Sequence, residues 1–262
     1  MSAVAGKHVF IAGGTSGINL GIARHFAEEG ARLSVLSRSQ EKVDAAAAEL
    51  SARGEAARGY AADVRDYAAL EAAMADAASA SGPIDCVIAG AAGNFLAPAI
   101  ALSANAFKTV IDIDLLGAFN TFRASWDHLN RPGASLIAIS AGQAVTPKPM
   151  QAHACAAKAG INMLVKCLAL EWGPAGVRVN AISPGPIKET EGMERLAPTP
   201  EMEAAIKKRL ALRDYGTKQD VASMAAYLAS DAASYITGSI MNVDGGGDLG
   251  DASVDCLTIP AR

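Results

Sequence analysis

The chain contains 262 residues, of which 51% are hydrophobic and 19% are charged. A chain of this length can bury one substantial hydrophobic core, and its composition suits a single large α/β domain. Its net charge of -4 argues against polyanionic partners, so we expect neither nucleic acid nor an acidic membrane surface to bind it.

Short β-branched or aliphatic runs alternate with alanine-rich stretches of helical period along the chain. These runs predict strands over residues 8–13, 32–37, 57–62, 84–90, 135–140, 177–183 and 239–245. The stretches between them predict helices over residues 17–30, 40–53, 66–81, 104–129, 152–173, 200–212 and 218–230. Repeated strand–helix units imply parallel strands joined by right-handed crossovers. The sequence therefore predicts one α/β domain over residues 1–262, an open sheet with helices on both faces, and a C-terminal tail over residues 248–262.

Membrane and metal sites are not expected. The uncharged run over residues 86–107 contains Gly90, Gly93 and Pro98, which are typical of a buried strand and loop rather than of a membrane span. The cysteines at positions 86, 155, 167 and 256 form no CxxC pair, so neither a metal site nor a disulfide framework is predicted. Reduced thiols and a chain end, CLTIPAR, that differs from an SKL-type address favour the cytoplasm.

The segment AGGTSGINLG, residues 12–21, follows the first predicted strand and opens a helix. Gly13 can make the tight turn, and Gly17 lets the backbone approach a pyrophosphate at the helix N-terminus. Asn19 stands where a third glycine usually closes this motif, and asparagine tolerates unusual backbone angles. The pattern predicts a dinucleotide site, with these loop residues as ligands: Gly13, Thr15, Ser16, Gly17 and Ile18.

The end of the second predicted strand indicates which dinucleotide binds. An acidic residue there would hold the ribose hydroxyls of NAD, but the sequence SVLSRSQEK offers Ser37 and then Arg38. A guanidinium at this position suits a 2′-phosphate, so NADP(H) is the predicted cofactor. Asp63, after the third predicted strand, is the candidate acceptor for the adenine amino group.

The chain resembles the short-chain dehydrogenase/reductase family over nearly its whole length. In the order and spacing of that family it contains AGGTSGIN, AADV, IAGAAG, DIDLLG, HACAAKAG, VRVNAISPGPI and ITGSIMNVDGG. The resemblance implies a single-domain Rossmann fold whose seven-stranded parallel sheet has the order 3-2-1-4-5-6-7, commonly in homotetramers. It also implies a mobile substrate lid over about residues 187–214 and cofactor contacts beside the nicotinamide from Pro184, Gly185, Ile187 and Thr190.

Usual members of this family reduce ketones with asparagine, serine, tyrosine and lysine side chains. By spacing, the asparagine becomes Asp114, and the serine becomes Ala141 with Ser140 next to it. The tyrosine becomes Ala154, so only Lys158 is retained. A methyl group donates no proton to an alkoxide, and loss of a general acid costs on the order of 10² to 10⁴ in rate. Ketone reduction by the usual route is therefore not expected.

Three longer segments narrow the resemblance. The segments are similar to the 2,4-dienoyl-CoA reductases, most closely the peroxisomal type, in which aspartate and lysine also replace the tyrosine arrangement. They read GNFLAPAIALSANAFKTVIDIDLLGAFN, QAHACAAK and PGPIKETEGMERL. Hydride addition to a dienoyl thioester spreads charge onto the thioester oxygen, so no alkoxide has to be protonated. The resemblance implies reduction of a conjugated acyl-CoA, with Asp114 and Lys158 as catalytic residues. It also implies substrate contacts from Phe95, at the acyl or nicotinamide end, and from Arg195, near a coenzyme A phosphate.

Each polar residue of this region has an expected role. Lys158 is expected to hydrogen-bond the nicotinamide ribose, and Asp114 to orient a water or relay a proton. Asp112 is expected to be structural and Cys155 to serve packing. His153 is expected to be half-exposed at the start of a helix, although it lies beside the vacant tyrosine position.

Two other functions stay open. The chain is a 3-oxoacyl thioester or other carbonyl reductase if Ser140 or His153 serves as the proton donor. It is a nucleotide-binding regulatory subunit if no turnover occurs. The apolar stripe of Ile161, Leu164, Val165 and Leu168 fits packing against another subunit or against the chain's own sheet.

Overall fold

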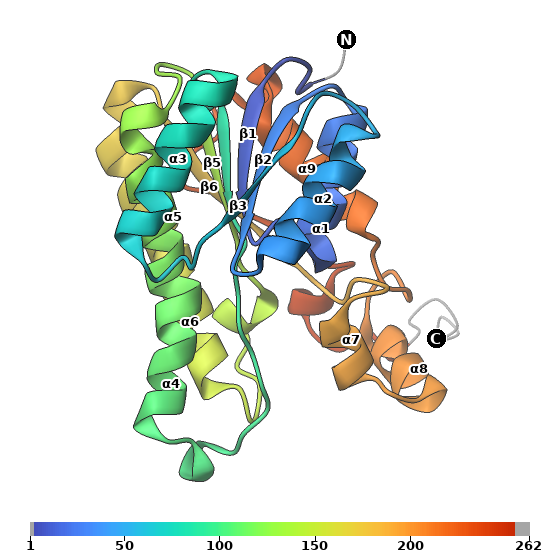
Figure 1. Ribbon diagram of the computed structural model, residues 1–262. Coiled ribbons are helices and arrows are strands. Elements are labelled where there is room, and N and C mark those ends of the chain that lie inside the picture. The colour runs from blue at the N-terminus through green and yellow to red at the C-terminus, as the bar shows by residue number, and fades with distance from the viewer. Residues whose placement is uncertain (1–2, 255–262) are drawn as a thin grey trace.

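The computed structural model describes residues 3–254, which contain one sheet of seven parallel strands (Figure 1). The strands lie in the order β3-β2-β1-β4-β5-β6-β7, so the predicted fold is confirmed. Each strand lies within one or two residues of its predicted span. The strands are β1 (His8–Ala12), β2 (Arg32–Ser37), β3 (Arg58–Ala61), β4 (Cys86–Ala89), β5 (Ser135–Ile139), β6 (Arg178–Pro184) and β7 (Ile240–Val243).

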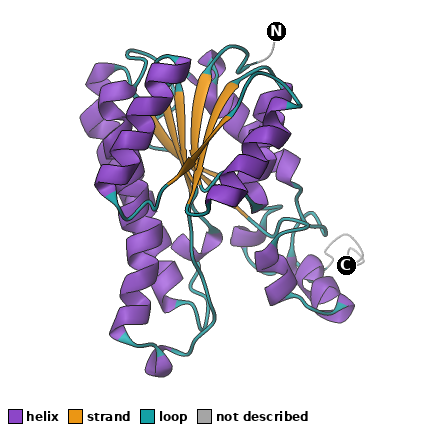
Figure 2. Cartoon of the chain, in the orientation of Figure 1, coloured by secondary structure: helices purple, strands orange, loops and turns teal. Residues whose placement is uncertain are grey.

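Helices cover both faces of the sheet (Figure 2). One face carries α3 (Tyr67–Ser81), α5 (Gly117–Ser125) and α6 (Ala152–Trp172), and the other carries α1 (Gly17–Glu28), α2 (Gln40–Ser51) and α9 (Lys218–Ala229). Three further helices project beyond the carboxyl ends of the strands (Figure 1): α4 (Ala104–Ile111), α7 (Glu191–Leu196) and α8 (Pro200–Arg209). Short 3-10 turns lie at residues 99–101, 126–128, 142–144, 173–175, 231–233 and 247–249.

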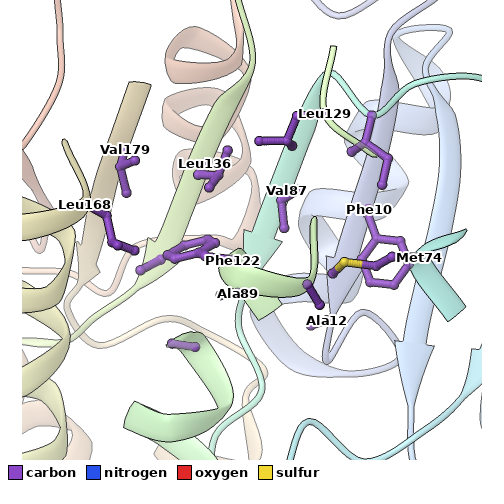
Figure 3. Packing of buried hydrophobic residues seen from close by; sticks show 14 of the residues in the cluster. Phe10, Ala12, Met74, Val87, Ala89, Phe122, Leu129, Leu136, Leu168 and Val179 are labelled. Carbon is purple, nitrogen blue, oxygen red and sulfur yellow. The ribbon is translucent and has the colours of Figure 1, made fainter. Parts of the chain in front are cut away.

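Alternate residues of the strands supply the two halves of the core. In β1, Phe10 and Ala12 belong to the apolar cluster beneath α3, α5 and α6, whereas Val9 and Ile11 belong to the cluster beneath α1, α2 and α9. Figure 3 shows Phe10 and other members of the first cluster. Both faces of the sheet are therefore buried, which leaves the carboxyl ends of the strands as the place for a ligand site.

The apolar stripe on α6 packs against the chain's own sheet. Ile161, Val165 and Leu168 are buried in the first cluster, and Leu164 packs against it. The stripe is thus explained by intrachain packing, which is the second of the two interpretations open from the sequence.

The helix predicted over residues 104–129 is wrong as a single α-helix. A π-helical segment at Asp112–Leu116 separates α4 from α5, and a 3-10 turn at Trp126–His128 follows. A Cβ added at Gly117 would lie 2.6 Å from Val64 Cγ2, so this glycine lets the helix approach the loop after β3 closely. The wide turns of a π-helix increase the local spacing of side chains, and π-helical segments often occur at functional sites.

Two other boundaries differ from the sequence prediction. The helix predicted over residues 200–212 ends as α8 at Arg209, and the six-residue helix α7 was not predicted because EGMERL is too short to show a helical period. Both helices lie within the segment 187–214 that was predicted as a lid. Of the predicted tail, residues 248–254 are described, and the Ala252 N–H donates to the Arg209 carbonyl at 3.1 Å; the rest of the tail and Cys256 lie outside the described residues.

Neither a membrane span nor a metal cluster occurs among residues 3–254. No helix in this range is both long and apolar enough to cross a bilayer, and no group of three or more metal-ligating side chains converges there. The described cysteines, Cys86, Cys155 and Cys167, are free.

Replacement of Gly59 tests the close packing of α2 on β3. A Cβ at Gly59 would lie 2.6 Å from the Val43 carbonyl oxygen of α2. We expect Gly59→Ala to lower the free energy of unfolding by about 1–3 kcal/mol, because the helix must shift to admit the methyl group. Gly173→Ala is the matched control, since no atom lies within 4 Å of its added Cβ and its φ is −53°. Urea denaturation measures the free energy of unfolding of both variants. An equal loss in Gly59→Ala and Gly173→Ala would contradict the packing argument.

Candidate active site

The loop between β1 and α1 presents backbone to an open space. Gly13 has φ of +79°, and a Cβ there would lie 2.8 Å from the Ala91 nitrogen, so the turn requires glycine. Gly17, with φ of +56°, opens α1, and nothing lies within 4 Å of the position of its Cβ. Ser16 precedes it without a side-chain capping hydrogen bond. Uncapped N–H groups at a helix start next to free space suit a phosphate.

Asn19 is accommodated by a glycine on the neighbouring strand loop. Its Nδ2 donates to the Gly90 carbonyl at 2.8 Å, and a Cβ at Gly90 would overlap the Asn19 amide. The asparagine therefore fills the space that a side chain at position 90 would take. Sequence reasoning found the unusual Asn19 but not its partner, because Gly90 is distant in the chain.

The two residues predicted to bind the adenosine end of the cofactor both lie at the carboxyl edge of the sheet. Arg38 is exposed after β2, and Asp63 is partly buried after β3. Arg65 holds Asp63 through two side-chain bonds, with Nε 3.0 Å from Oδ1 and Nη2 2.6 Å from Oδ2. These bonds lower the pKa of Asp63, and the positive field of Arg38 contributes weakly in the same direction. Arg65 was not identified from the sequence, although it stands two residues after Asp63.

Lys158 and Asp114 meet in a buried ion pair. Lys158 Nζ lies 3.3 Å from Asp114 Oδ2 and donates to the Ile139 carbonyl at the end of β5 at 2.9 Å. The other carboxylate oxygen, Oδ1, accepts the Gly93 N–H at 2.8 Å. The Asp114 side chain is 2% exposed and the Lys158 side chain 11%. The two residues predicted as catalytic are therefore brought together, whereas Asp112 is partly buried and pairs with Lys108 instead.

The positions predicted to lack the usual hydroxyls are occupied by small side chains. Ala154, on the first turns of α6, is 3% exposed, and Ala141 follows β5. Ser140 is buried, and its hydroxyl donates to Asn162 Oδ1 at 2.6 Å. The hydroxyl proton of Ser140 is thus already used in an intrachain hydrogen bond.

The loop after β4 lies across the start of α6. Asn94 Nδ2 donates to Gln151 Oε1 at 2.9 Å, and the Ala97 N–H donates to the Met150 carbonyl at 2.9 Å. The Phe95 ring packs on the His153 ring with centroids 4.5 Å apart. The expectation that His153 is half-exposed is wrong, because Phe95 and its neighbours leave the histidine 0% exposed. Gln151 was missed from the sequence because glutamine has no motif that marks it as a loop anchor.

The segment predicted to lie beside the nicotinamide continues from β6. Pro184 and Ile187 are buried, and Thr190 donates its hydroxyl to the Ile187 carbonyl at 2.8 Å. A Cβ at Gly185 would lie 2.6 Å from Asp244 Cα, so this glycine permits close contact with the loop after β7. Arg195 on α7 is exposed and pairs with Glu191.

Comparison with known proteins identifies the family. A family model described as "Enoyl-(Acyl carrier protein) reductase" matches residues 12–248. The chain belongs to the short-chain dehydrogenase/reductase family. The peroxisomal 2,4-dienoyl-CoA reductase [(3E)-enoyl-CoA-producing] of Danio rerio is 41% identical over 93% of this chain and 82% of that protein.

Solved members of the short-chain dehydrogenase/reductase family share the fold. A short chain dehydrogenase from Bacillus anthracis has a TM-score of 0.80 and 36% identity, covering 92% of this chain and 96% of the other. A gluconate 5-dehydrogenase from Burkholderia cenocepacia, solved with NADP and tartrate, has a TM-score of 0.88 and 28% identity, covering 93% and 96%. The chain is thus similar to oxidoreductases with different substrates, and its own side chains must decide the reaction.

The buried pair predicts a strong energetic coupling. Lys158→Met leaves the Asp114 carboxylate buried without its cation, and we expect the free energy of unfolding to fall by about 3–5 kcal/mol. The double variant Asp114→Asn/Lys158→Met should recover most of this loss. Lys108→Met is the control, because its pair with Asp112 is exposed on the Lys108 side and is worth about 0.5 kcal/mol or less. Urea denaturation measures the wild type, Lys158→Met, the single variant Asp114→Asn, the double variant and the control. A loss in the double variant equal to the sum of the two single losses would contradict the coupling.

Proposed function

We propose that the chain is an NADP-dependent reductase of conjugated acyl-CoA thioesters, in the manner of a 2,4-dienoyl-CoA reductase. The observation that carries this proposal is the buried pair of Asp114 and Lys158 next to the methyl group of Ala154. The pair supplies fixed charge and hydrogen bonds at a place that offers no phenol. A substrate whose added electrons spread over a conjugated thioester needs this fixed charge and these hydrogen bonds. It can do without a phenol.

The residues present fit a dinucleotide. The open space at Gly17, the uncapped start of α1 and the turn at Gly13 suit a pyrophosphate, with Thr15, Ser16 and Ile18 beside it. Arg38 would hold the 2′-phosphate, and Asp63 the adenine amino group. Lys158 would hold the nicotinamide ribose hydroxyls, and the segment from Pro184 to Thr190 would flank the nicotinamide. When bound, the cofactor supplies the hydride.

Lys158 and Asp114 act on the substrate end of the reaction in this proposal. The ammonium group of Lys158, held in place by the Ile139 carbonyl and by Asp114, gives a positive potential beside the developing negative charge. The Asp114 carboxylate is held by the Gly93 N–H, so it can orient a water that delivers the proton to carbon. The low exposure of both groups strengthens these interactions.

The substrate assignment rests on exposed residues above the pair and on named relatives. Phe95 is 40% exposed in the loop that supplies Gly93, so its ring can contact an acyl chain. Arg195 is exposed on α7 in the segment proposed as a lid and can reach a coenzyme A phosphate after leaving Glu191. The relative from Danio rerio is named for producing (3E)-enoyl-CoA, which supports a dienoyl thioester and this product.

The two alternatives have weaker support. Carbonyl reduction with Ser140 as donor requires that the hydroxyl leave Asn162, to which it donates at 2.6 Å. A regulatory subunit without turnover would have no use for a buried ion pair at the reaction site, since hydrophobic residues of similar size are often as stable.

We further propose a homo-oligomer, as in other members of the family, in the cytoplasm. Helices α4 and α6 and the π-helical segment contact one another, and these elements together with α5 carry exposed apolar side chains. These are Phe107, Leu116, Phe119 and Met163. A second copy of the chain is the expected cover of this surface.

Steady-state kinetics with 2,4-hexadienoyl-CoA tests the function. The wild-type protein should oxidise NADPH with this substrate, and Asp114→Asn should lower kcat by about 10² to 10⁴, because the neutral amide is a weaker acceptor for the water that delivers the proton and breaks the pair with Lys158. Asp112→Asn is the control and should keep wild-type kcat, since Asp112 pairs with the exposed Lys108 and not with Lys158.

The alternatives make different predictions for the same assay. Reduction of a 3-oxoacyl thioester alone would establish the carbonyl reductase. Binding of NADPH without oxidation by dienoyl, enoyl or oxoacyl thioesters would establish the regulatory subunit. Ala154→Tyr should create ketone reduction where the wild type has none, which tests the position of the missing phenol.

Replacement of Arg38 tests the choice of cofactor. We expect Arg38→Ala to raise the KM for NADPH roughly 10- to 100-fold, because a charge-assisted hydrogen bond contributes about 1.5–3 kcal/mol. The KM for NADH should stay within about twofold. Arg123→Ala, on the exposed surface of α5, is the control. An unchanged KM for NADPH would contradict the assignment of Arg38 to the 2′-phosphate.

A further inference from the structure

His153 is a buried imidazole without hydrogen bonds. It lies on the first turn of α6, is 0% exposed, and neither Nδ1 nor Nε2 has a partner among residues 3–254. Its neighbour Ala154 is the proposed vacant tyrosine position. The His153 ring contacts Phe95, in the loop whose Gly93 N–H donates to Asp114, so the ring lies close to the proposed site of reduction. A polar group buried in this way is rare and calls for an explanation.

A second buried histidine in the same protein shows the usual arrangement. His8 is also 0% exposed, but its Nδ1 lies 2.7 Å from the Gly82 carbonyl and its Nε2 lies 2.9 Å from Ser34 Oγ. His8 is at the amino end of β1, far from the carboxyl edge that carries the site. Of the two histidines that are buried among residues 3–254, His8 thus has a partner for each ring nitrogen and His153 has none.

The partly exposed Phe95 ring lies against His153. The rings are tilted by 33° with centroids 4.5 Å apart, and Phe95 is itself 40% exposed in a segment without helix or strand. The backbone on either side of Phe95 is held by Asp114 at Gly93 and by Met150 at Ala97, whereas the Phe95 side chain is held by its ring contact. Rotation of this side chain would uncover the imidazole without moving the loop.

We propose that His153 is a further catalytic residue, which donates a hydrogen bond to the thioester carbonyl oxygen of the substrate once the Phe95 ring turns aside. The inference rests on the proposed reduction of a conjugated acyl thioester. Neutral imidazole has one N–H donor, and a carbonyl oxygen is the acceptor that such a substrate brings. The hydrogen bond that the free protein lacks is then made in the complex.

The hydrogen bond acts on the charge formed by hydride addition. Hydride adds to the δ carbon, the two conjugated electron pairs shift toward the thioester, and the C=O bond becomes C–O⁻. His153 donates to this oxygen and keeps its proton. Water then protonates carbon, the C=O bond forms again, and oxidised cofactor and hydroxide are the other products. A donor fixed at the site of developing charge stabilises this intermediate more than the bound substrate.

Two variants of His153 separate a catalytic role from a structural one. His153→Leu removes both ring nitrogens at similar volume, so we expect kcat for 2,4-hexadienoyl-CoA to fall about 10²-fold or more. The melting temperature should rise by about 2–4 °C, because an uncompensated polar group leaves the interior. His153→Gln keeps an N–H donor and should retain a kcat above that of the leucine variant.

His8→Leu is the matched control. It removes two existing hydrogen bonds, so the melting temperature should fall while kcat of the folded enzyme stays at the wild-type value. A leucine variant at 153 that keeps wild-type kcat, or that melts below the wild type as His8→Leu does, would overturn the proposal.

A binding measurement keeps this inference separate from the proposed function. Hexanoyl-CoA carries the thioester carbonyl but no conjugated bond to reduce, and its affinity for the NADP-loaded protein can be measured by calorimetry. Wild type should bind it at least about threefold more tightly than His153→Leu, with a shift of the His153 ring ¹⁵N resonances on binding. If the wild type fails to reduce any dienoyl thioester, the proposed function fails, yet this affinity difference still tests His153. Equal affinities, no binding, or unshifted resonances would overturn the role of His153.

Discussion

The buried ion pair between Lys158 and Asp114 is the constraint on which the site depends. Two charges at 2% and 11% side-chain exposure are stable only if further hydrogen bonds hold them, and the Gly93 N–H and the Ile139 carbonyl supply these. Each partner comes from a different element: the loop after β4, the end of β5, the helix α6 and the π-helical turn. The parallel sheet is what brings these four segments to one edge, because the carboxyl ends of its strands lie together. The sheet topology therefore places the two side chains to which we assign the chemistry.

In the proposed assignment Ala154 stands at the position of the family's phenol, and its methyl group would limit the chemistry that this pair can perform. An alkoxide formed from a ketone needs a proton at the reacting centre, and Ala154 offers none. A conjugated thioester spreads the incoming charge to its oxygen, where a cation and a hydrogen-bond donor suffice. The pair of Lys158 and Asp114 together with a buried imidazole at His153 suits this second case. The proposed activity thus follows from what the site lacks as much as from what it contains.

Much of the fold was predictable, because it depends on patterns local to the sequence. Apolar strand runs, the glycine turn and the register of Lys158 on α6 led to the observed sheet order and to two charged residues, Asp114 and Lys158, that the fold brings together. The break at Asp112–Leu116 was not predictable from periodicity, since helical residues continue through it. The burial of His153 and the packing of Asn19 on Gly90 depend on contacts between segments distant in the chain. Such contacts become visible only once the loops after β4 and β5 are placed.

Deuterium transfer tests the central claim most directly. The protein is incubated with 2,4-hexadienoyl-CoA and NADPH that carries deuterium on the transferable position of the nicotinamide, and the product is analysed by NMR. The account predicts deuterium on the δ carbon of the acyl chain, with the second new hydrogen drawn from solvent. A parallel incubation with a 3-oxoacyl thioester is the comparison. Deuterium found only on the carbinol carbon of its 3-hydroxyacyl product, with no transfer to the dienoyl substrate, would contradict the account and indicate ordinary ketone reduction.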